Sequence, residues 1–459
     1  MARKKSLLEK TISAPAVALE KTIEGTQATI RDIASKKPVK EVRGFWDTLG
    51  PGLTTGASDD DPSGIATYSQ TGAQYGNQLL WLAGFTFPFM AVVQEMCARI
   101  GLVTGRGLAA NIRQNYSKPI LIICTTFLFI ANVFNIGVDL GAMAAATQLL
   151  IPSMNFFVLA LFFTVVSLLL QIFSTYARYA KYLKYLTLVL FSYIFSALLV
   201  HGLNWGAIGR AAFVPSFQNF SKEQLFLICA ILGTTISPYL FFWQTSQEVE
   251  DEILSGNTTL RQRKGATHEE IKKMRIDVWT GMFFSNAIMF FIIIACAGTL
   301  FANGVTDIKT AADAAKALRP LAGEASYILF ALGIIGTGLL AVPVLAGSAA
   351  YAVSESFRWK EGLFLKLNQA YAFYGILIIS MLVGFSLNFL GIDPIKALIY
   401  SAVFNGLIAP VVLVLIVSMS SNKKIMGKWV NGPVTKIIGW IITILMIFVG
   451  AATVVTFFL

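Results

Sequence analysis

Residues 58–64 read SDDDPSG and lie within an apolar segment that runs over residues 45–75. Proline removes a backbone donor and disfavours helix at the residue before it, so a helix is expected to break at Pro62. One aspartate at the centre of a bilayer costs about 2.5–3.5 kcal/mol on insertion scales. Three in a row would not be kept merely to bend a helix. We therefore predict a cation site at this break.

A second break is expected at residues 233–238, which read GTTISP within the apolar segment 224–247. Such breaks persist at bilayer depth only where the freed backbone groups face protein or a water-filled cavity. The two breaks fall in the first and sixth apolar segments, which fits two five-helix halves of opposite orientation. In that architecture, discontinuous helices meet at the bilayer midplane and bind an ion.

The composition around these breaks is that of a membrane protein. Of the 459 residues, 56% are apolar and only 13% are charged, whereas a soluble domain has about 25% charged residues. A bilayer span needs about 20 mostly apolar residues. The stretches 120–150, 156–173 and 437–459 meet that requirement almost without charge. We therefore expect an all-α polytopic membrane protein.

Eleven spans are predicted from the apolar segments. They cover approximately residues 45–75, 78–103, 119–150, 155–173, 183–201, 224–247, 276–303, 325–356, 369–388, 396–420 and 436–458. The expected organisation is a cytoplasmic tail over 1–43, a first five-helix repeat over 44–201, a second over 202–420, and a loop with the eleventh helix over 421–459.

The distribution of positive charge predicts the orientation in the membrane. Most of the 36 Lys and Arg residues lie in the tail and in alternate loops, which are therefore placed in the cytoplasm. The opposite loops hold only Arg210, Lys222, Lys309, Lys316, Arg319 and Lys396. We predict a plasma (inner) membrane protein with its N-terminus cytoplasmic and its C-terminus outside. No removable signal peptide is predicted.

Several functional classes are disfavoured by the same inventory. The net charge of +11 lies in tails and loops, so nucleic acid is not an expected partner, and no obligate protein partner is evident beside the lipid bilayer. The cysteines (Cys97, Cys124, Cys229 and Cys296) stand alone in apolar segments and are interpreted as buried thiols. With only two histidines, the pattern of a zinc hydrolase is excluded. Neither an enzyme nor a cofactor is expected.

The chain resembles the natural-resistance-associated macrophage protein (NRAMP) family of divalent metal transporters over about residues 44–420. The resemblance rests on motifs in order: GPG at 50–52, DPSG at 61–64, QEMCARIG at 94–101, VTG at 103–105, Asp139-Leu140 and Ser237-Pro238. It implies a LeuT-like inverted 5+5 helix repeat with helices 1 and 6 broken, plus an eleventh span. It also implies transport rather than catalysis.

The resemblance assigns metal ligands to both breaks, and this chain departs from the family at most of them. The family reads Asp-Pro-Gly-Asn at the first break, where Asp and Asn bind metal; here Asp61 is kept but the Asn position is Gly64. The family reads Met-Pro-His-Asn at the sixth, where the Met sulfur touches the metal; here that position is Ser237. The family's Ala, whose carbonyl is a ligand, is Thr234.

These departures predict a preference for hard cations. Soft thioether ligands favour transition metals, while oxygen ligands and water favour Mg²⁺. Replacement of Asn by Gly at residue 64 is expected to open space for a partly hydrated ion, because Mg²⁺ dehydrates reluctantly. Asp59 and Asp60 would add negative potential, and Ser63 is a further candidate beside them. The chain is most similar to the NRAMP-related magnesium transporter branch (NRMT), with Mg²⁺ and Mn²⁺ as transported substrates.

The resemblance also predicts the loss of proton coupling. Proton-coupled members carry two histidines in the sixth span, at positions that are Tyr239 and Gln244 here, and a glutamate at the position of Ala142. None of the three residues present titrates near neutral pH. Asp139 is kept, and either a structural or a functional role remains open for it.

Other polar residues in or near the spans are weaker candidates for function. Asn405 in the tenth span either faces the cavity or bridges helices. Glu95 and Arg99 are four residues apart and are expected to pair. The acidic run 248–252 either attracts cations at the exit or is a solvated helix end, and the second interpretation is preferred.

Four rival functions compete with Mg²⁺ transport. A proton-coupled Mn²⁺/Fe²⁺ carrier is the principal alternative, and the missing Met and His argue against it. An amino-acid transporter of the same fold is disfavoured because three aspartates would repel a substrate carboxylate. A membrane-embedded enzyme with Ser237 as nucleophile lacks a general base at a recognisable spacing. A channel is not separable from a carrier by sequence.

Overall fold

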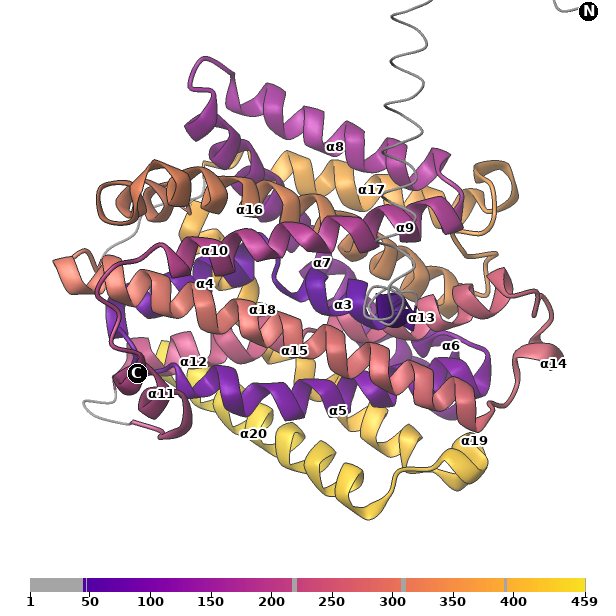
Figure 1. Ribbon diagram of the computed structural model, residues 1–459. Coiled ribbons are helices and arrows are strands. Elements are labelled where there is room, and N and C mark those ends of the chain that lie inside the picture. Colours follow the sequence, from indigo (N-terminus) through magenta and orange to yellow (C-terminus); the bar gives the residue numbers. More distant parts are fainter. Residues whose placement is uncertain (1–43, 47, 217–220, 307–310, 392–393, 459) are drawn as a thin grey trace, which may run out of the picture. The chain divides into compact units, whose positions relative to one another are not determined.

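The computed structural model describes residues 44–46, 48–216, 221–306, 311–391 and 394–458, and all the regular structure in those ranges is helical. The chain divides into the units Met1–Leu49 and Gly50–Leu459, and the labelled helices of Figure 1 all belong to the second unit. The predicted tail over residues 1–43 lies outside the described residues.

The helices follow one another with short connections. In chain order they are α3 (Pro51–Asp59), α4 (Pro62–Tyr75), α5 (Trp81–Thr104), α6 (Leu108–Asn115), α7 (Lys118–Leu150), α8 (Phe156–Phe173), α9 (Tyr176–Leu186), α10 (Phe191–Leu198), α11 (Trp205–Phe213), α12 (Lys222–Thr235), α13 (Pro238–Leu254), α14 (Leu260–Arg263), α15 (His268–Thr299), α16 (Ala311–Phe357), α17 (Tyr371–Leu387), α18 (Pro394–Ser420), α19 (Lys423–Met426) and α20 (Pro433–Phe458).

Eight helical segments of the described residues are long and apolar enough to cross a membrane. Apolar side chains cover their outer faces, among them Phe162 and Phe448, which are largely exposed. A polytopic membrane protein is therefore supported. The predicted first and fifth spans are composed of shorter helices, α3 with α4 and α9 with α10, and α17 is 17 residues long. The count of eleven spans stays a prediction.

Two helix junctions fall at the prolines that the sequence analysis singled out. Helix α3 ends at Asp59, Asp61 has extended backbone, and α4 begins at Pro62. Helix α12 ends at Thr235, Ser237 is extended, and α13 begins at Pro238. In each case the residue before the proline leaves the helical region, because the proline ring clashes with it there.

Close packing between helices fixes the position of α3. Helix α3 lies against α15, where a Cβ added to Gly56 would come within 2.3 Å of the Gly281 carbonyl oxygen. Small residues at such positions let two membrane helices approach backbone to backbone. At the start of α3, the Asp277 carboxylate accepts hydrogen bonds from the backbone amides of Gly50, Gly52 and Leu53 at 2.7–3.0 Å. A carboxylate at a helix N-terminus satisfies amides that have no partner inside the helix.

The remaining long helices surround the two junctions. Helix α16 packs along α7, α12 packs along α18, and α4 contacts α18, α12 and α7. Figure 1 shows α4 beside α15, and these two helices also contact each other. The side chains at both junctions are almost completely buried as a result.

Candidate metal site at the helix junctions

The Asp61 carboxylate is held by three neutral donors at the start of α4. Its Oδ1 accepts hydrogen bonds from the Ser63 hydroxyl at 2.6 Å and from the Gly64 amide at 2.7 Å. Its Oδ2 accepts a hydrogen bond from the Asn135 side-chain amide at 2.7 Å. Asp61 is thus the N-cap of α4, a position that favours a negative charge beside the helix dipole.

Asn135 links this carboxylate to two further helices. It lies on α7, and its own side-chain oxygen accepts a hydrogen bond from the Ser401 hydroxyl on α18. Both residues are buried. The amide therefore fixes the rotation of the Asp61 carboxylate from outside its own helix. Sequence analysis missed Asn135 and Ser401. A signal was present, because Asn135 is one helical turn before Asp139 in an otherwise apolar segment.

The neighbouring aspartates have fewer partners. Asp59 Oδ2 accepts a hydrogen bond from the Ser285 hydroxyl of α15 at 2.7 Å, while its Oδ1 has no partner among the described residues. In the same part of the chain, both carboxylate oxygens of Asp60 are buried without a hydrogen bond, as are those of Asp139. Buried carboxylates without partners lower the free energy of unfolding, so a protein tends to keep them only where they have a function. Because they lie around Asp61, these carboxyl groups favour a negative electrostatic potential at this junction.

The α12–α13 junction supplies hydroxyl and carbonyl oxygens. The Ser237 hydroxyl donates to the carbonyls of Gly233 at 2.7 Å and of Thr234 at 2.6 Å. The Thr234 carbonyl, a predicted ligand, is therefore already engaged by one hydrogen bond. A carbonyl and a hydroxyl oxygen each keep lone pairs that can accept from water or bind a cation.

The two junctions face each other. A Cβ added to Gly64 would come within 2.9 Å of the Thr234 hydroxyl oxygen and 3.3 Å of the Asp59 carbonyl oxygen. The Tyr239 hydroxyl of α13 donates to the Ser58 carbonyl at 2.8 Å, and the Tyr239 carbonyl accepts from Ser348 of α16 at 2.9 Å. The structure thus brings together the residues Asp61, Ser63, Gly64, Thr234 and Tyr239.

One expectation about Gly64 is corrected by this geometry. The absence of an asparagine side chain does not leave open space here, because the Thr234 hydroxyl occupies the adjoining volume. An asparagine at residue 64 could fit only if Thr234 moved.

Two of the predicted site residues are not hydrogen-bonded to Asp61. Gln244 lies further along α13 and donates to the Glu248 carboxylate at 2.8 Å. Asn405 is buried on α18, a helix that contacts α4. Within the described residues, no three His, Cys, Asp or Glu side chains are grouped so that they could hold a metal ion. The candidate ligands are therefore one carboxylate, that of Asp61, and neutral oxygens, with the buried carboxylates of Asp59 and Asp60 nearby.

The four cysteines are buried and free of disulfides, as the sequence analysis expected. They lie on four different helices, among apolar side chains of the core. The described residues therefore hold no thiolate site, and the candidate metal ligands at the junctions are all oxygen atoms.

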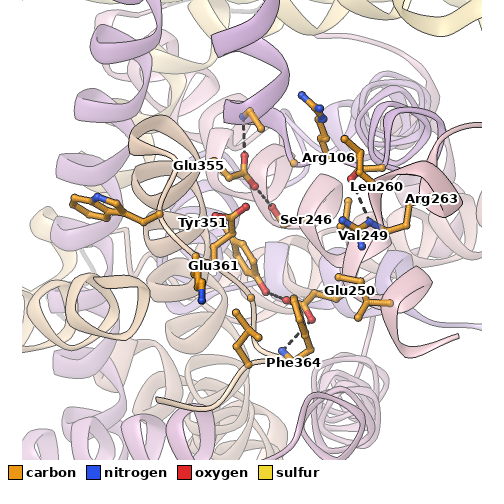
Figure 2. A pocket seen from close by; sticks show the side chains of 18 of the residues that line it. Arg106, Ser246, Val249, Glu250, Leu260, Arg263, Tyr351, Glu355, Glu361 and Phe364 are labelled. Atoms are coloured by element: carbon orange, nitrogen blue, oxygen red, sulfur yellow. Dashed lines mark hydrogen bonds between the residues drawn. The ribbon is translucent and has the colours of Figure 1, made fainter. Parts of the chain in front are cut away.

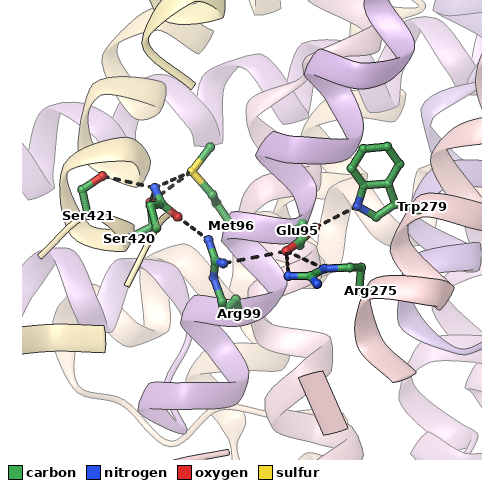
Figure 3. Close-up of polar contacts among 8 residues, drawn as sticks. Glu95, Met96, Arg99, Arg275, Trp279, Ser420 and Ser421 are labelled. Atoms are coloured by element: carbon green, nitrogen blue, oxygen red, sulfur yellow. Dashed lines mark hydrogen bonds and ion pairs between the residues drawn. The ribbon is translucent and has the colours of Figure 1, made fainter. Parts of the chain in front are cut away.

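Glu95 on α5 is surrounded by cationic and polar donors (Figure 3). Its carboxylate accepts from the Arg275 guanidinium at 2.8 and 3.0 Å and from the Trp279 indole at 2.8 Å. The predicted pairing with Arg99 is present at 3.7 Å, but Arg275 is the nearer partner. Arg99 also donates to Asn431, which links α5 to the chain segment before α20.

A cavity of about 420 Å³ lies at the far end of α13 (Figure 2). There the Glu250 carboxylate accepts from the Tyr351 hydroxyl at 2.5 Å and from the amides of Leu363 and Phe364 at 2.7 and 3.1 Å. Glu355 accepts from the Ala110 amide at 2.9 Å and from Ser246 at 3.2 Å.

The interpretation of the acidic run 248–252 as a solvated helix end is wrong. Glu248 and Glu250 are buried, because the loop after α16 and helices α5 and α6 cover this end of α13. In that loop, burial raises the pKa of Glu361 to about 7, although the guanidinium groups of Arg113 and Arg263 act in the opposite direction. The Glu250 carboxylate ties the loop to α13.

Comparisons with known proteins agree with this architecture. The model of the natural resistance-associated macrophage protein-like family matches residues 52–456. A crystal structure of the Eremococcus coleocola manganese transporter in complex with an aromatic bis-isothiourea substituted compound superposes with a TM-score of 0.70 at 18% identity, covering 91% of this chain and 88% of that chain. A mutant of the same transporter superposes with a TM-score of 0.66 at the same identity and coverage.

A more distant likeness is to Mhp1, a nucleobase-cation-symport-1 family transporter, in a closed conformation. Its TM-score is 0.55 at 14% identity, with 89% of this chain and 91% of that chain covered. At these identities, the three superpositions establish the helical fold only. The substrate has to be inferred from the residues of the site.

Proposed function

The chain belongs to the natural resistance-associated macrophage protein-like family of transporters, and we propose that it carries Mg²⁺, with Mn²⁺ as a second substrate. The observation that carries this proposal is the donor set at the two junctions. It contains the Asp61 carboxylate, the Thr234 and Ser237 oxygens, and no sulfur. Oxygen donors favour Mg²⁺ and Mn²⁺, whereas a thioether would favour softer metals.

We propose that the ion is bound with part of its water shell. A carboxylate has about four lone-pair sites, and three hydrogen bonds from Ser63, Gly64 and Asn135 already occupy most of those on Asp61. About one lone-pair site therefore remains on Asp61, for either a direct bond to the ion or a hydrogen bond from one of its waters. Mg²⁺ binds through one or two carboxylates and keeps several waters, which matches such a site.

The proposed architecture is a pair of inverted five-helix repeats whose first and sixth spans are discontinuous. The ends of α3 and α12 and the starts of α4 and α13 support it, because each junction combines extended backbone with a proline. In this proposal α3 with α4 forms the first span and α12 with α13 forms the sixth. The protein lies in the plasma (inner) membrane, with its N-terminus cytoplasmic, its C-terminus outside and the substrate bound near the midplane.

We further propose that transport is not coupled to protons. The Tyr239 hydroxyl is committed to the Ser58 carbonyl, and Gln244, which has no titrating group, is bonded to Glu248. Ala142 stands where coupled members carry a glutamate. An inside-negative potential supplies about 2.3 kcal/mol per charge per 100 mV, so a divalent cation gains twice that without any proton.

The test is a flux assay in proteoliposomes with a pH dye inside and an imposed gradient of Mg²⁺ or Mn²⁺. We expect both ions to enter, no acidification above that of empty liposomes, and faster uptake when the inside is negative. Mn²⁺ uptake with acidification that is lost in Asp139→Asn or Asp60→Asn would instead establish a proton-coupled carrier of the Mn²⁺/Fe²⁺ type. Uptake of Mn²⁺ alone would contradict the hydrated-ion site.

Channel and carrier behaviour are separated in the same vesicles. A carrier accelerates uptake of labelled Mg²⁺ when unlabelled Mg²⁺ is present on the opposite side, because the loaded site returns faster than the empty one. A channel shows no such acceleration. We expect the carrier result, since both helix junctions are enclosed by protein.

A further inference from the structure

A second cavity, of about 700 Å³, lies on the outer side of α7 and α16 and reaches α17. Three cations line it: Arg113 of α6, Lys118 at the first position of α7, and Arg358 directly after α16. No carboxylate is among the described residues that line it. This cation-lined cavity is separate from the helix junctions that hold Asp61.

The rest of the wall is mainly apolar and continues onto the membrane-facing surface; its polar side chains are Thr126 and the hydrogen-bonded pair Thr125 and Ser356, whose hydroxyls lie 2.9 Å apart. The side chains of Leu121 of α7, Val353 of α16 and Ile376 of α17 line the cavity. Next to them, Ile122 is 56% exposed and Phe357 is 60% exposed, and both belong to helices that qualify as membrane spans. The cavity is thus open toward the lipid rather than toward the centre of the helix bundle.

The position of the cations matches a membrane interface. Lys118 begins one candidate span and Arg358 follows the end of another, so both charged groups lie at the same level as the span ends. The Phe357 ring stacks on Trp359 at 5.0 Å, and tryptophan is enriched at that depth of a bilayer. By the predicted topology, this is the cytoplasmic face, where anionic lipids attract basic groups.

Among the described residues, the cavity itself supplies no carboxylate to Lys118 and Arg358, whereas Arg113 also lies near Glu355 and Glu361. Arg113 donates to the backbone carbonyl of Glu355, while the carboxylate of Glu355 accepts from Ala110 and Ser246 on the other side. Burial and the nearby Arg358 lower the pKa of the Arg113 guanidinium, which Glu355 and Glu361 offset only in part. An anionic group bound here would relieve that repulsion.

We propose that the cation-lined cavity binds an anionic phospholipid. Its phosphate lies between Lys118, Arg358 and Arg113, and an acyl chain lies in the apolar groove over Leu121 and Ile376. The argument is charge complementarity together with an apolar wall that opens to the bilayer. A free phosphate would use the cations alone and leave the groove uncovered, so the lipid is the occupant that fits both halves of the cavity.

The experiment measures phosphatidylglycerol binding to the full chain in detergent, by native mass spectrometry over a lipid titration. Phosphatidylcholine is the comparison lipid, and inorganic phosphate is the competitor. The variant is K118Q/R358Q. The matched control is K423Q/K424Q, which removes two exposed lysines from the short helix α19 at the same predicted face. A charge-retaining variant, K118R/R358K, tests the geometry without changing the charge.

We expect phosphatidylglycerol to bind more tightly than phosphatidylcholine, and K118Q/R358Q to weaken it about 30-fold, as two surface cations would. The lysine control and the charge-retaining variant should bind within about threefold of the wild type. Equal losses in both glutamine variants, equal binding of phosphatidylcholine, or displacement of the lipid by millimolar phosphate would each overturn the proposal. Thermal unfolding of every variant verifies that the fold is intact.

Discussion

Glu95 and the aspartates at the α3–α4 junction are all buried carboxylates, yet the chain surrounds them differently. Glu95 is paired with Arg275 and Arg99 and also accepts from Trp279. Asp61 accepts only from neutral groups, and Asp60 has no hydrogen bond among the described residues. Glu95 is neutralised by arginines of the same chain. The aspartates at the junction have no such partner within the described part of the chain and are suited to a cation that binds from solution.

This difference separates structural from functional charge. A buried ion pair is worth little net stability but is costly to break, so Glu95 acts as a fixed link between α5 and α15. Unpaired aspartates destabilise the fold, and a protein keeps them where the charge is used. Substitutions at the junction should therefore affect transport more than stability, and substitutions at Glu95 the reverse.

The largest effect is expected for Asp61→Ala. Removal of the carboxylate leaves a divalent ion without a charged partner in a buried site, where such losses cost about 3–5 kcal/mol. Mg²⁺ flux into proteoliposomes should fall by about 100-fold or more. Thermal unfolding should shift downward by the equivalent of about 1 kcal/mol, because the decreased repulsion from Asp59 and Asp60 offsets only part of the loss of the α4 N-cap and its hydrogen bonds. Flux near the wild-type level would remove Asp61 from the site.

Asn135→Ala should have the next largest effect. The substitution frees Asp61 Oδ2 and breaks the link to Ser401. Groups that orient a metal ligand typically change affinity or activity by about 10–100-fold, and we expect an increase of the Mg²⁺ concentration for half-maximal flux in that range. The control is Asn132→Ala, one turn earlier on α7, where the side chain donates to Leu345 instead. Equal effects of both would indicate helix packing rather than ligand orientation.

Ion preference should shift when sulfur and amide ligands are introduced at the junctions. The variant is G64N/T234A/S237M, in which the alanine removes the hydroxyl that a side chain at residue 64 would meet at 2.9 Å. The ratio of Mn²⁺ to Mg²⁺ flux should rise by roughly tenfold, which corresponds to about 1.4 kcal/mol. G64N/S237M, with Thr234 intact, should transport poorly. An unchanged ratio in the triple variant would show that these donors do not set selectivity.

Glu95→Gln should affect stability instead of transport. It removes the charged partner of Arg275, whose side chain is 54% exposed and can turn to water. Arg99, whose side chain is only 6% exposed, loses the same partner and cannot turn to water, so we expect a loss of about 3 kcal/mol, the lower end of the range for breaking a buried ion pair. Thermal unfolding measures it, with Mg²⁺ flux as the second readout. A collapse of flux without a change in unfolding would contradict the structural role.

The smallest effect is predicted for Glu361→Gln, and it depends on pH. The folded-state pKa of Glu361 is raised to about 7, above its ordinary value. Its stabilising contribution is therefore present at low pH and is lost as the pH rises through about 7. The free energy of unfolding of the variant should equal that of the wild type near pH 4. At pH 8 it should be higher by on the order of 1 kcal/mol, a figure reduced because Glu361 is partly exposed. Thermal unfolding at both pH values measures the difference. Glu269→Gln, at an exposed position in α15, is the control and should not show this pH dependence.

The sequence predicted the helical class, and the two prolines that it singled out stand at the starts of α4 and α13, since both features depend on local causes. Pro62 and Pro238 prevent helix at the preceding residue whatever lies around them, and apolar segments such as 156–173 can only be membrane helices. The prediction for the run 248–252 was wrong, because the periodicity of a helix does not indicate which loops cover its end. The sequence analysis also missed Asn135, because one buried amide in an apolar helix is as often a packing contact as a partner of a functional group.

By itself, the amino-acid sequence determined that the candidate site lacks sulfur: residue 237 is a serine and not a methionine, and no fold can change that. Tertiary structure decided what the oxygens of the site are bonded to. Asn135 and Ser401 are separated by hundreds of residues along the chain, yet they set the orientation of Asp61, and Thr234 fills the volume beside Gly64. Orientation and space depend on helices meeting, and the helices meet only after the whole chain has packed.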